Sequence, residues 1–214
     1  MKERLKLASR AMQAGMVGLA LSAPFTGDYT YVPAAVVALL ISVLPTLIRR
    51  DLKLVLPVEL NFWIVLALFV HIVGSFSGLY DNLPGWDHLT HAMSASLVAA
   101  LGFVVVVAID KYAESIYLPP AFLGLFIVMF TMAIGVIWEL MEFIVDEATG
   151  SLLQYSLSDT MLDLVFDTMG GLLVASAGSY YLTHTSVDHF VDSLNVGTAK
   201  EKVEKFMERR SRDG

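Results

Sequence analysis

The sequence predicts an all-α, polytopic integral membrane protein. Of its 214 residues, 56% are hydrophobic and only 16% are charged, the mean hydropathy is +0.66, and several apolar runs reach about 20 residues, the length that crosses a bilayer. A soluble domain carries fewer apolar residues and about a quarter charged ones. The absence of cysteine excludes disulfides and thiolate metal ligands. The net charge of −7 argues against a nucleic-acid partner.

Each predicted span is an apolar run that ends at charged or turn-forming residues. The six spans are 8–25, 31–48, 58–79, 86–109, 119–145 and 158–183. Their ends are marked in order by Thr26-Gly27, Arg49 to Lys53, Asp81 to Gly85, Asp110-Lys111 and Gly150. The first span is diluted by Ala, Gly and Ser, and its charged start also resembles a signal peptide. We count it as a span because the predicted topology needs an even number. The six spans form one transmembrane domain, 1–185.

The positions of the basic residues predict the orientation of the chain. All fourteen Lys and Arg fall before or at the start of the first span, between spans two and three, between spans four and five, or after the sixth. The three opposite loops contain none. Because cytoplasmic loops are enriched in Lys and Arg, we expect both termini in the cytoplasm and a multi-pass protein of the plasma membrane.

Residues 186–214 form a charged, amphipathic C-terminal tail. Val187, Phe190, Val191 and Leu194 recur at helical spacing, and Asn195 to Gly197 interrupts the run. The tail is predicted to be cytoplasmic and to lie on the inner membrane surface or on itself. A helix that binds a specific partner is the alternative.

Three spans carry acidic and imidazole side chains on single helical faces. Residues spaced by three or four positions share one face of a helix. The three sets are Asp87, His88 and His91 in span four, Glu139, Glu142 and Asp146 late in span five, and Asp159, Asp163 and Asp167 in span six. Since spans four and six run inward and span five runs outward, all three sets are expected near the external surface.

So many carboxylates in a small volume would repel one another unless they bind protons or a cation. We therefore predict a divalent metal site with the ligands Asp87, His91, Glu139, Glu142, Asp159, Asp163 and Asp167. Imidazole with carboxylate suits Zn²⁺, Mn²⁺ or Fe²⁺, and an all-oxygen set suits Mg²⁺ or Ca²⁺. Taken singly, each residue also has an ordinary interpretation as a helix cap or an interfacial side chain.

These motifs resemble those of the VanZ-like and YjdF-like membrane proteins. The Asp-x-x-x-His pattern matches Asp87 and His91, Glu-x-x-Glu matches Glu139 and Glu142, and Asp-Thr-x-x-Asp before a glycine pair matches Asp159, Thr160 and Asp163 with Gly170. His88 and Asp167 depart from the pattern by adding ligands. The resemblance covers about 60–185 and implies a compact helical membrane fold. One branch of the family is associated with glycopeptide resistance, which implies chemistry of the cell envelope or its lipids.

Three functions are compatible with this arrangement. The first is a metal-dependent hydrolase or transferase that acts on a lipid or lipid-linked envelope substrate, with Glu142 or His88 as the catalytic base. The second is a cation or proton transporter, and the third is a metal-stabilised scaffold or sensor without catalysis. The expected partners are membrane lipid and a lipid-linked substrate. Homo-oligomerisation is left open by the sequence.

Overall fold

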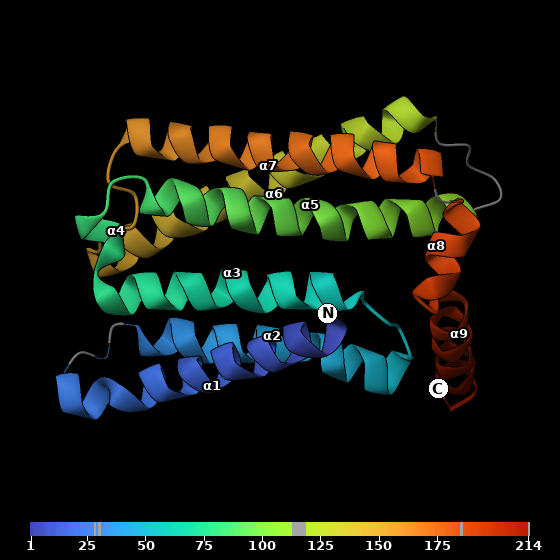
Figure 1. The fold of residues 1–214 in the computed structure, drawn as a ribbon, viewed down its shortest axis with the longest axis horizontal. Coiled ribbons are helices and arrows are strands. Elements are labelled where there is room, and N and C mark those ends of the chain that lie inside the picture. Colours follow the sequence, from blue (N-terminus) through green and yellow to red (C-terminus); the bar gives the residue numbers. More distant parts are fainter. Residues whose placement is uncertain (28, 30, 113–118, 185, 214) are drawn as a thin grey trace. The chain divides into compact units, whose positions relative to one another are not determined.

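A computed structural model of the chain describes residues 1–27, 29, 31–112, 119–184 and 186–213, and every secondary-structure element in these residues is a helix (Figure 1). The helices are α1 (Lys2–Thr26), α2 (Val32–Leu52), α3 (Val58–Ser77), α4 (Leu79–Asn82), α5 (Trp86–Tyr112), α6 (Pro120–Thr149), α7 (Leu157–His184), α8 (Val187–Ser193) and α9 (Val196–Asp213). The six predicted spans correspond to α1, α2, α3, α5, α6 and α7, with ends that differ by a few residues. The all-helical fold is thus confirmed for the described residues.

Five of these helices are long and apolar enough to cross a membrane. Among the described residues, the qualifying segments are Val32–Leu52, Val58–Ser77, Trp86–Lys111, Ala121–Thr149 and Leu157–Leu182. They agree with the prediction of a multi-pass membrane protein. Helix α1 has 25 residues but is not among the five, which fits the small and polar residues that dilute it. The count of six spans and the orientation of the termini therefore remain predictions.

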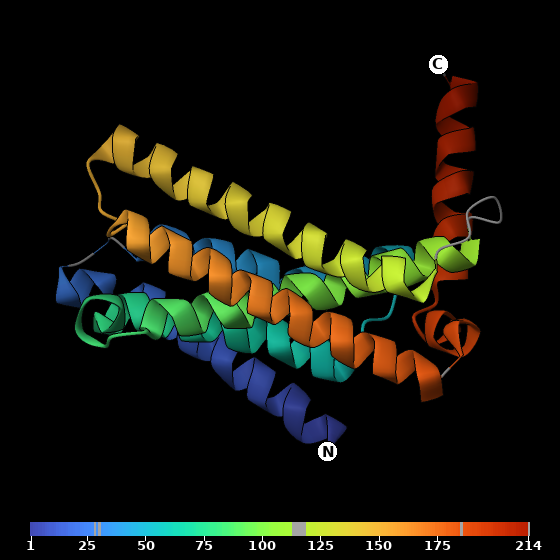
Figure 2. The same ribbon diagram turned by 90° about the horizontal axis from the view of Figure 1, so that it is seen from above.

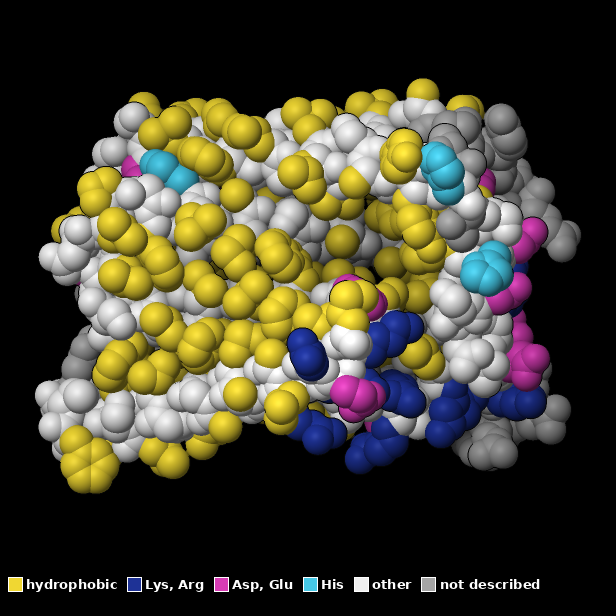
Figure 3. Space-filling view, viewed as in Figure 1, with side chains coloured by type: hydrophobic (Ala, Val, Ile, Leu, Met, Phe, Trp, Pro, Cys, Tyr) yellow, Lys and Arg dark blue, Asp and Glu magenta, His cyan; other side chains and the backbone are white. Residues whose placement is uncertain are grey.

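Contacts between the helices group the chain into two units. Residues 1–79 and 187–214 form the first unit, and residues 80–186 form the second. The predicted division into a domain of 1–185 and a tail of 186–214 remains a prediction. On the face drawn in Figure 3, hydrophobic side chains cover much of the helices, and Lys and Arg side chains gather on the first unit near the N-terminus and α9.

The first unit has its own apolar core between α1, α2 and α3. Met16, Ala35, Val65 and Ile72 are buried in it. The amide of Gln13 donates to Oγ of Ser42 at 3.1 Å and joins α1 to α2.

The tail packs within the first unit. The backbone N–H of Val55 donates to the carbonyl of Leu194 at 2.9 Å. The predicted break at Asn195 to Gly197 is shorter in the structure, because Asn195 adopts a left-handed φ of 60° and α9 already begins at Val196.

The second unit is built from α5, α6 and α7, which contact one another in all three pairs (Figures 1 and 2). A glycine pair on α7 allows this close packing. A Cβ built on Gly170 would lie 2.9 Å from the backbone nitrogen of Ser96 on α5, and one on Gly171 would lie 3.2 Å from Cβ of Thr131 on α6. Small residues let membrane helices approach closely, so this pair serves packing.

Candidate metal centre

The three helices of the second unit bring all the predicted site residues to one end. Asp87, His88 and His91 lie in the first turns of α5, and Asp159, Asp163 and Asp167 lie in the first three turns of α7. Glu139 and Glu142 lie in the last turns of α6. Because α6 runs opposite to its two neighbours, its C-terminal end meets their N-terminal ends.

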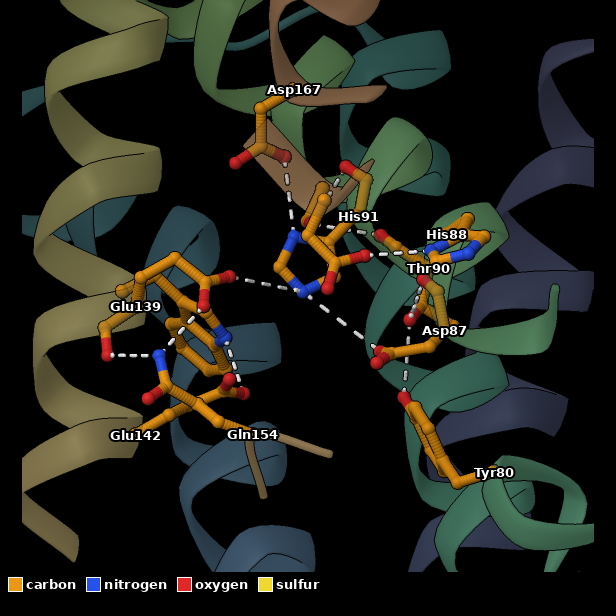
Figure 4. Close-up of polar contacts among 12 residues, drawn as sticks. Tyr80, Asp87, His88, Thr90, His91, Glu139, Glu142, Gln154 and Asp167 are labelled. Atoms are coloured by element: carbon orange, nitrogen blue, oxygen red, sulfur yellow. Dashed lines mark hydrogen bonds and ion pairs between the residues drawn. The ribbon is translucent and has the colours of Figure 1, made fainter. Parts of the chain in front are cut away.

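His91 is the central side chain of this cluster (Figure 4). It is buried, with 6% of its surface exposed. Its Nδ1 lies 3.3 Å from Oδ1 of Asp167 on α7. Its Nε2 lies 3.8 Å from Oδ1 of Asp87 on α5 and 3.9 Å from Oε1 of Glu139 on α6. One imidazole ring therefore contacts carboxylates from all three helices.

The two sides of the His91 ring differ in their geometry. The Nδ1 side is within hydrogen-bond range of Asp167, whereas the two distances at Nε2 exceed the usual hydrogen-bond length. Two ligands of one metal ion, at bond lengths of about 2.0–2.2 Å, lie roughly 3–4 Å apart. The spacing at Nε2 therefore fits a shared cation better than a direct hydrogen bond.

The carboxylate of Glu139 has one oxygen without a partner. Oε1 is buried and accepts no hydrogen bond from any residue that the structure describes. The side chain as a whole is 7% exposed, and this oxygen is the one that lies 3.9 Å from Nε2 of His91. A buried carboxylate oxygen without a hydrogen-bond partner is costly, so Oε1, which faces His91, is available to accept a hydrogen bond or to bind a cation.

Asp163 belongs to two groups of potential ligands. One ligand atom from each of Asp87, His91 and Asp163 lies within 4.8 Å of the others, and the same holds for His88, Asp159 and Asp163. Nδ1 of His88 also lies 2.8 Å from Oδ1 of Asp163. The His88 ring stacks on Phe166, with centroids 5.1 Å apart. In this conformation His88 orients Asp163.

Glu142 and Asp146 accept hydrogen bonds from residues other than His91, and the role of Glu142 as a metal ligand remains a prediction. Oε1 of Glu142 accepts a hydrogen bond from Nε1 of Trp138 at 2.8 Å, one turn earlier on α6. Glu142, Glu139 and Asp167 are in neither ligand group, and Glu139 and Asp167 join the cluster through their contacts with His91. Asp146 accepts three hydrogen bonds from Ser151, Leu153 and Gln154. Although Asp146 continues the helical face of Glu139, it holds the α6–α7 connection instead.

Gln154 and the hydrogen bonds around Asp87 are features that only the structure reveals. Nε2 of Gln154 donates to Oε2 of Glu139 at 2.9 Å. Thr90 donates to the backbone carbonyl of Asp87 at 2.8 Å and accepts from the hydroxyl of Tyr80 at 3.2 Å. Gln154 is the only amide side chain in a loop of Ser, Leu and Tyr, but a loop has no periodicity that would assign it to a helix face.

Access to the cluster is uneven. The side chains of Asp163, Asp167 and Glu139 are 3%, 5% and 7% exposed, whereas those of Asp87 and His88 are 20% and 21% exposed. The cluster is therefore closed on the His91 side and open on the side of Asp87 and His88.

The cluster also lies in a strongly acidic part of the chain. Between residues 54 and 199 the sequence contains a single basic residue of the Lys or Arg type, Lys111, and it lies at the other end of α5. Without a nearby basic side chain, the carboxylates depend on protons or bound cations for neutralisation.

A comparison with protein families identifies the chain. Residues 7–184 match the family described as predicted membrane protein (DUF2238). The chain belongs to this family. The match covers most of α1 and all of α2 to α7, so the matched region of this chain includes the whole candidate centre. This match does not address the resemblance to VanZ-like and YjdF-like proteins, which remains a prediction.

The chain is also similar to a protein of Thermotoga maritima. An uncharacterized protein of Thermotoga maritima is 29% identical over 107 residues, which are 49% of this chain and 53% of the relative. The chain thus matches about half of the length of that protein. No solved structure matches the chain.

Proposed function

We propose that this membrane protein binds a divalent metal ion at the centre formed by His91, Asp87, Glu139 and Asp163. The arrangement of the His91 ring carries the proposal. Its Nδ1 faces Asp167, while its Nε2 faces Asp87 and Glu139 at distances that suit ligands of one ion. In metal centres, a ligating histidine almost always donates its other ring N–H to a carboxylate or a carbonyl. Here Asp167 is the carboxylate that faces the other ring nitrogen, Nδ1 of His91.

The metal itself is left open by this ligand set. One imidazole with several carboxylates suits Zn²⁺, Mn²⁺ or Fe²⁺, and the carboxylates of Asp159 and Asp163 with further oxygens suit Mg²⁺ or Ca²⁺. A divalent ion would offset the repulsion among the acids, which is the physical reason for preferring a metal over bare carboxylates.

We further propose that the centre is catalytic and acts on a lipid or lipid-linked substrate at the external surface. A bound divalent ion supplies Lewis-acid chemistry and lowers the pKa of a bound water. His88 and Glu142 are the candidate bases, and His88 lies on the open side of the cluster. The lack of a nearby Lys or Arg means that a phosphate group would be held through the ion. The resemblance to VanZ-like and YjdF-like proteins supports a substrate from the cell envelope.

The external location follows from charge and does not depend on whether α1 crosses the membrane. With either five or six spans, the segments around Arg49 to Lys53, Lys111 and Lys200 to Arg212 fall on the same side, opposite to the candidate centre. The positive-inside rule assigns this basic side to the cytoplasm.

Transport is less well supported by the second unit. From Ala92 to Ile109, from Pro120 to Trp138 and from Thr168 to Thr183, the sequence contains no Asp, Glu, His, Lys or Arg. A path for ions from the centre to the other end of α5, α6 and α7 would need such groups or a polar pore.

Metal analysis of the purified protein tests the proposal. We expect stoichiometric divalent metal in the wild type and loss of most of it in His91→Ala and Asp163→Ala. The matched controls are His184→Ala, at the other end of α7, and Glu147→Gln, an exposed acid on α6. Both controls should keep the metal. Equally negligible metal in the wild type and all variants would overturn the proposal.

Two further measurements separate catalysis from the other functions. A coordinated water that exchanges with solvent, detected by nuclear relaxation in the Mn²⁺-loaded protein, is expected for an enzyme and not for a closed scaffold. Ion flux into liposomes, lost in His91→Ala, would support transport instead.

A further inference from the structure

The connection between α6 and α7, residues 150–156, makes three hydrogen bonds to a single carboxylate. We call these residues the α6–α7 strap. Asp146 accepts hydrogen bonds from Oγ of Ser151 at 2.7 Å, from the backbone N–H of Leu153 at 2.8 Å and from that of Gln154 at 2.9 Å. Gly150, with a φ of 72°, turns the chain out of α6 into the strap. The side chain of Asp146 thereby fixes the position of Gln154.

Gln154 extends from the strap back to the candidate centre (Figure 4). Its Nε2 donates to the backbone carbonyl of Glu139 at 3.0 Å and to Oε2 of the same residue at 2.9 Å. This occupies one oxygen of the Glu139 carboxylate and leaves Oε1, which is buried, 3.9 Å from Nε2 of His91. The amide of Gln154 therefore determines which oxygen of Glu139 faces the centre.

A second contact holds the strap at its other side. The hydroxyl of Tyr155 donates to Oδ1 of Asp81 on α4 at 3.1 Å. Tyr155 lies outside the membrane-spanning helices, and burial together with this hydrogen bond raises the pKa of its phenol to about 12. The phenol therefore stays protonated and able to donate at neutral pH. The strap is thus fixed on both sides of Gln154.

We propose that Gln154 is a positioning residue for the metal ligand Glu139, so that metal affinity depends on the conformation of the α6–α7 strap. This inference rests on the proposed metal centre and adds a means of regulating it: a change that displaces the strap would free the Glu139 carboxylate to rotate. Hydrogen bonds that orient a ligand typically affect metal affinity by about 10–100-fold. Gln154 contacts Glu139, so it would affect a bound ion through that residue.

The experiment measures the Kd of Zn²⁺ and Mn²⁺ by titration calorimetry on the full-length protein in detergent. Gln154→Met keeps the length of the side chain and removes both donors, and we expect it to weaken binding by about 10-fold. The control Leu152→Ala changes a strap side chain that is 76% exposed and should leave the Kd unchanged.

A double-mutant cycle with Glu139→Gln distinguishes positioning from a general loss of stability. If Gln154 acts through Glu139, adding Gln154→Met to Glu139→Gln should weaken binding by less than 2-fold (about 0.4 kcal/mol), because the two changes are coupled. Two independent 10-fold effects would multiply, and that result would overturn the positioning role. An unchanged Kd in Gln154→Met would overturn it as well, with the metal centre intact. A wild type that binds neither ion would overturn both proposals.

Discussion

Gly135 on α6 lies directly opposite Asp167 on α7, and a Cβ built on Gly135 would overlap Oδ2 of Asp167. The missing side chain therefore creates the space that the Asp167 carboxylate occupies. Asp167 in turn lies 3.3 Å from Nδ1 of His91. A glycine that offers no ligand atom of its own thus permits the contact between Asp167 and the central histidine.

Gly135→Ala should impair the centre, and Gly124→Ala should not. The added methyl group at 135 must displace Asp167 or separate the helices, at a cost of about 1–3 kcal/mol, and we expect metal affinity to fall by about 10-fold. A Cβ at Gly124, on the same helix, meets nothing within 4 Å, so helix propensity alone should make that variant neutral or slightly more stable. Thermal unfolding in detergent measures the change in stability, and calorimetric titration in detergent measures the metal Kd. Equal effects of the two substitutions would contradict the assignment.

Asp167→Asn should weaken metal binding by about 10-fold without removing it. The amide is close in size, but it is a weaker acceptor for the His91 ring than a carboxylate and holds the metal-binding tautomer less firmly. The comparison is with Asp188→Asn, an exposed carboxylate on α8. The same Kd in both variants and the wild type would show that Asp167 has no orienting role.

Gly170→Val should destabilise the second unit by about 1–3 kcal/mol through overpacking. A Cβ there already lies 2.9 Å from the backbone nitrogen of Ser96 and 3.0 Å from Cβ of Ala95, and the backbone of α5 cannot rotate away as a side chain can. Gly18→Val on α1 is the control, because a Cβ at Gly18 meets nothing within 4 Å. The measurement is the shift in thermal unfolding midpoint. A shift at Gly18 as large as at Gly170 would mean that the close contact is not the cause.

The stability of the strap should decrease at alkaline pH because of Tyr155. Its folded pKa of about 12 lies above the ordinary tyrosine value of 10.0, so the folded state holds the proton more tightly than the unfolded state. This contribution is fully present below pH 10 and is lost as the pH rises toward 12. Because the side chain is half exposed, solvent screening keeps the effect small.

The matching variant for this effect is Tyr155→Phe. The wild type should lose more unfolding free energy between pH 8 and pH 11 than Tyr155→Phe, and proteolysis of residues 150–156 should accelerate only in the wild type over that range. Parallel pH profiles for the two proteins would disprove the role of this hydroxyl.

The sequence by itself determined the helices and the composition of the site. An apolar run that can cross a bilayer extends over about 20 residues, so one or two polar residues do not obscure it. The five helices that are long and apolar enough to cross a membrane were therefore predicted to within a few residues of their ends. The spacing of Asp87 and His91, of Glu139 and Glu142, and of Asp159, Asp163 and Asp167 assigns each set to one face, because 3.6 residues per turn is a local property of any helix.

Only the tertiary structure decided which of these side chains meet. Helical periodicity places Glu139, Glu142 and Asp146 on one face of α6. In the structure Glu139 contacts His91, Glu142 contacts Trp138, and Asp146 contacts the strap. Gln154 and Gly135 carry no periodic signal at all, since one acts from a loop and the other through the side chain that it lacks. Their roles arise from how three helices and one connection fit together in space, and such a fit depends on contacts between residues that are distant in the sequence.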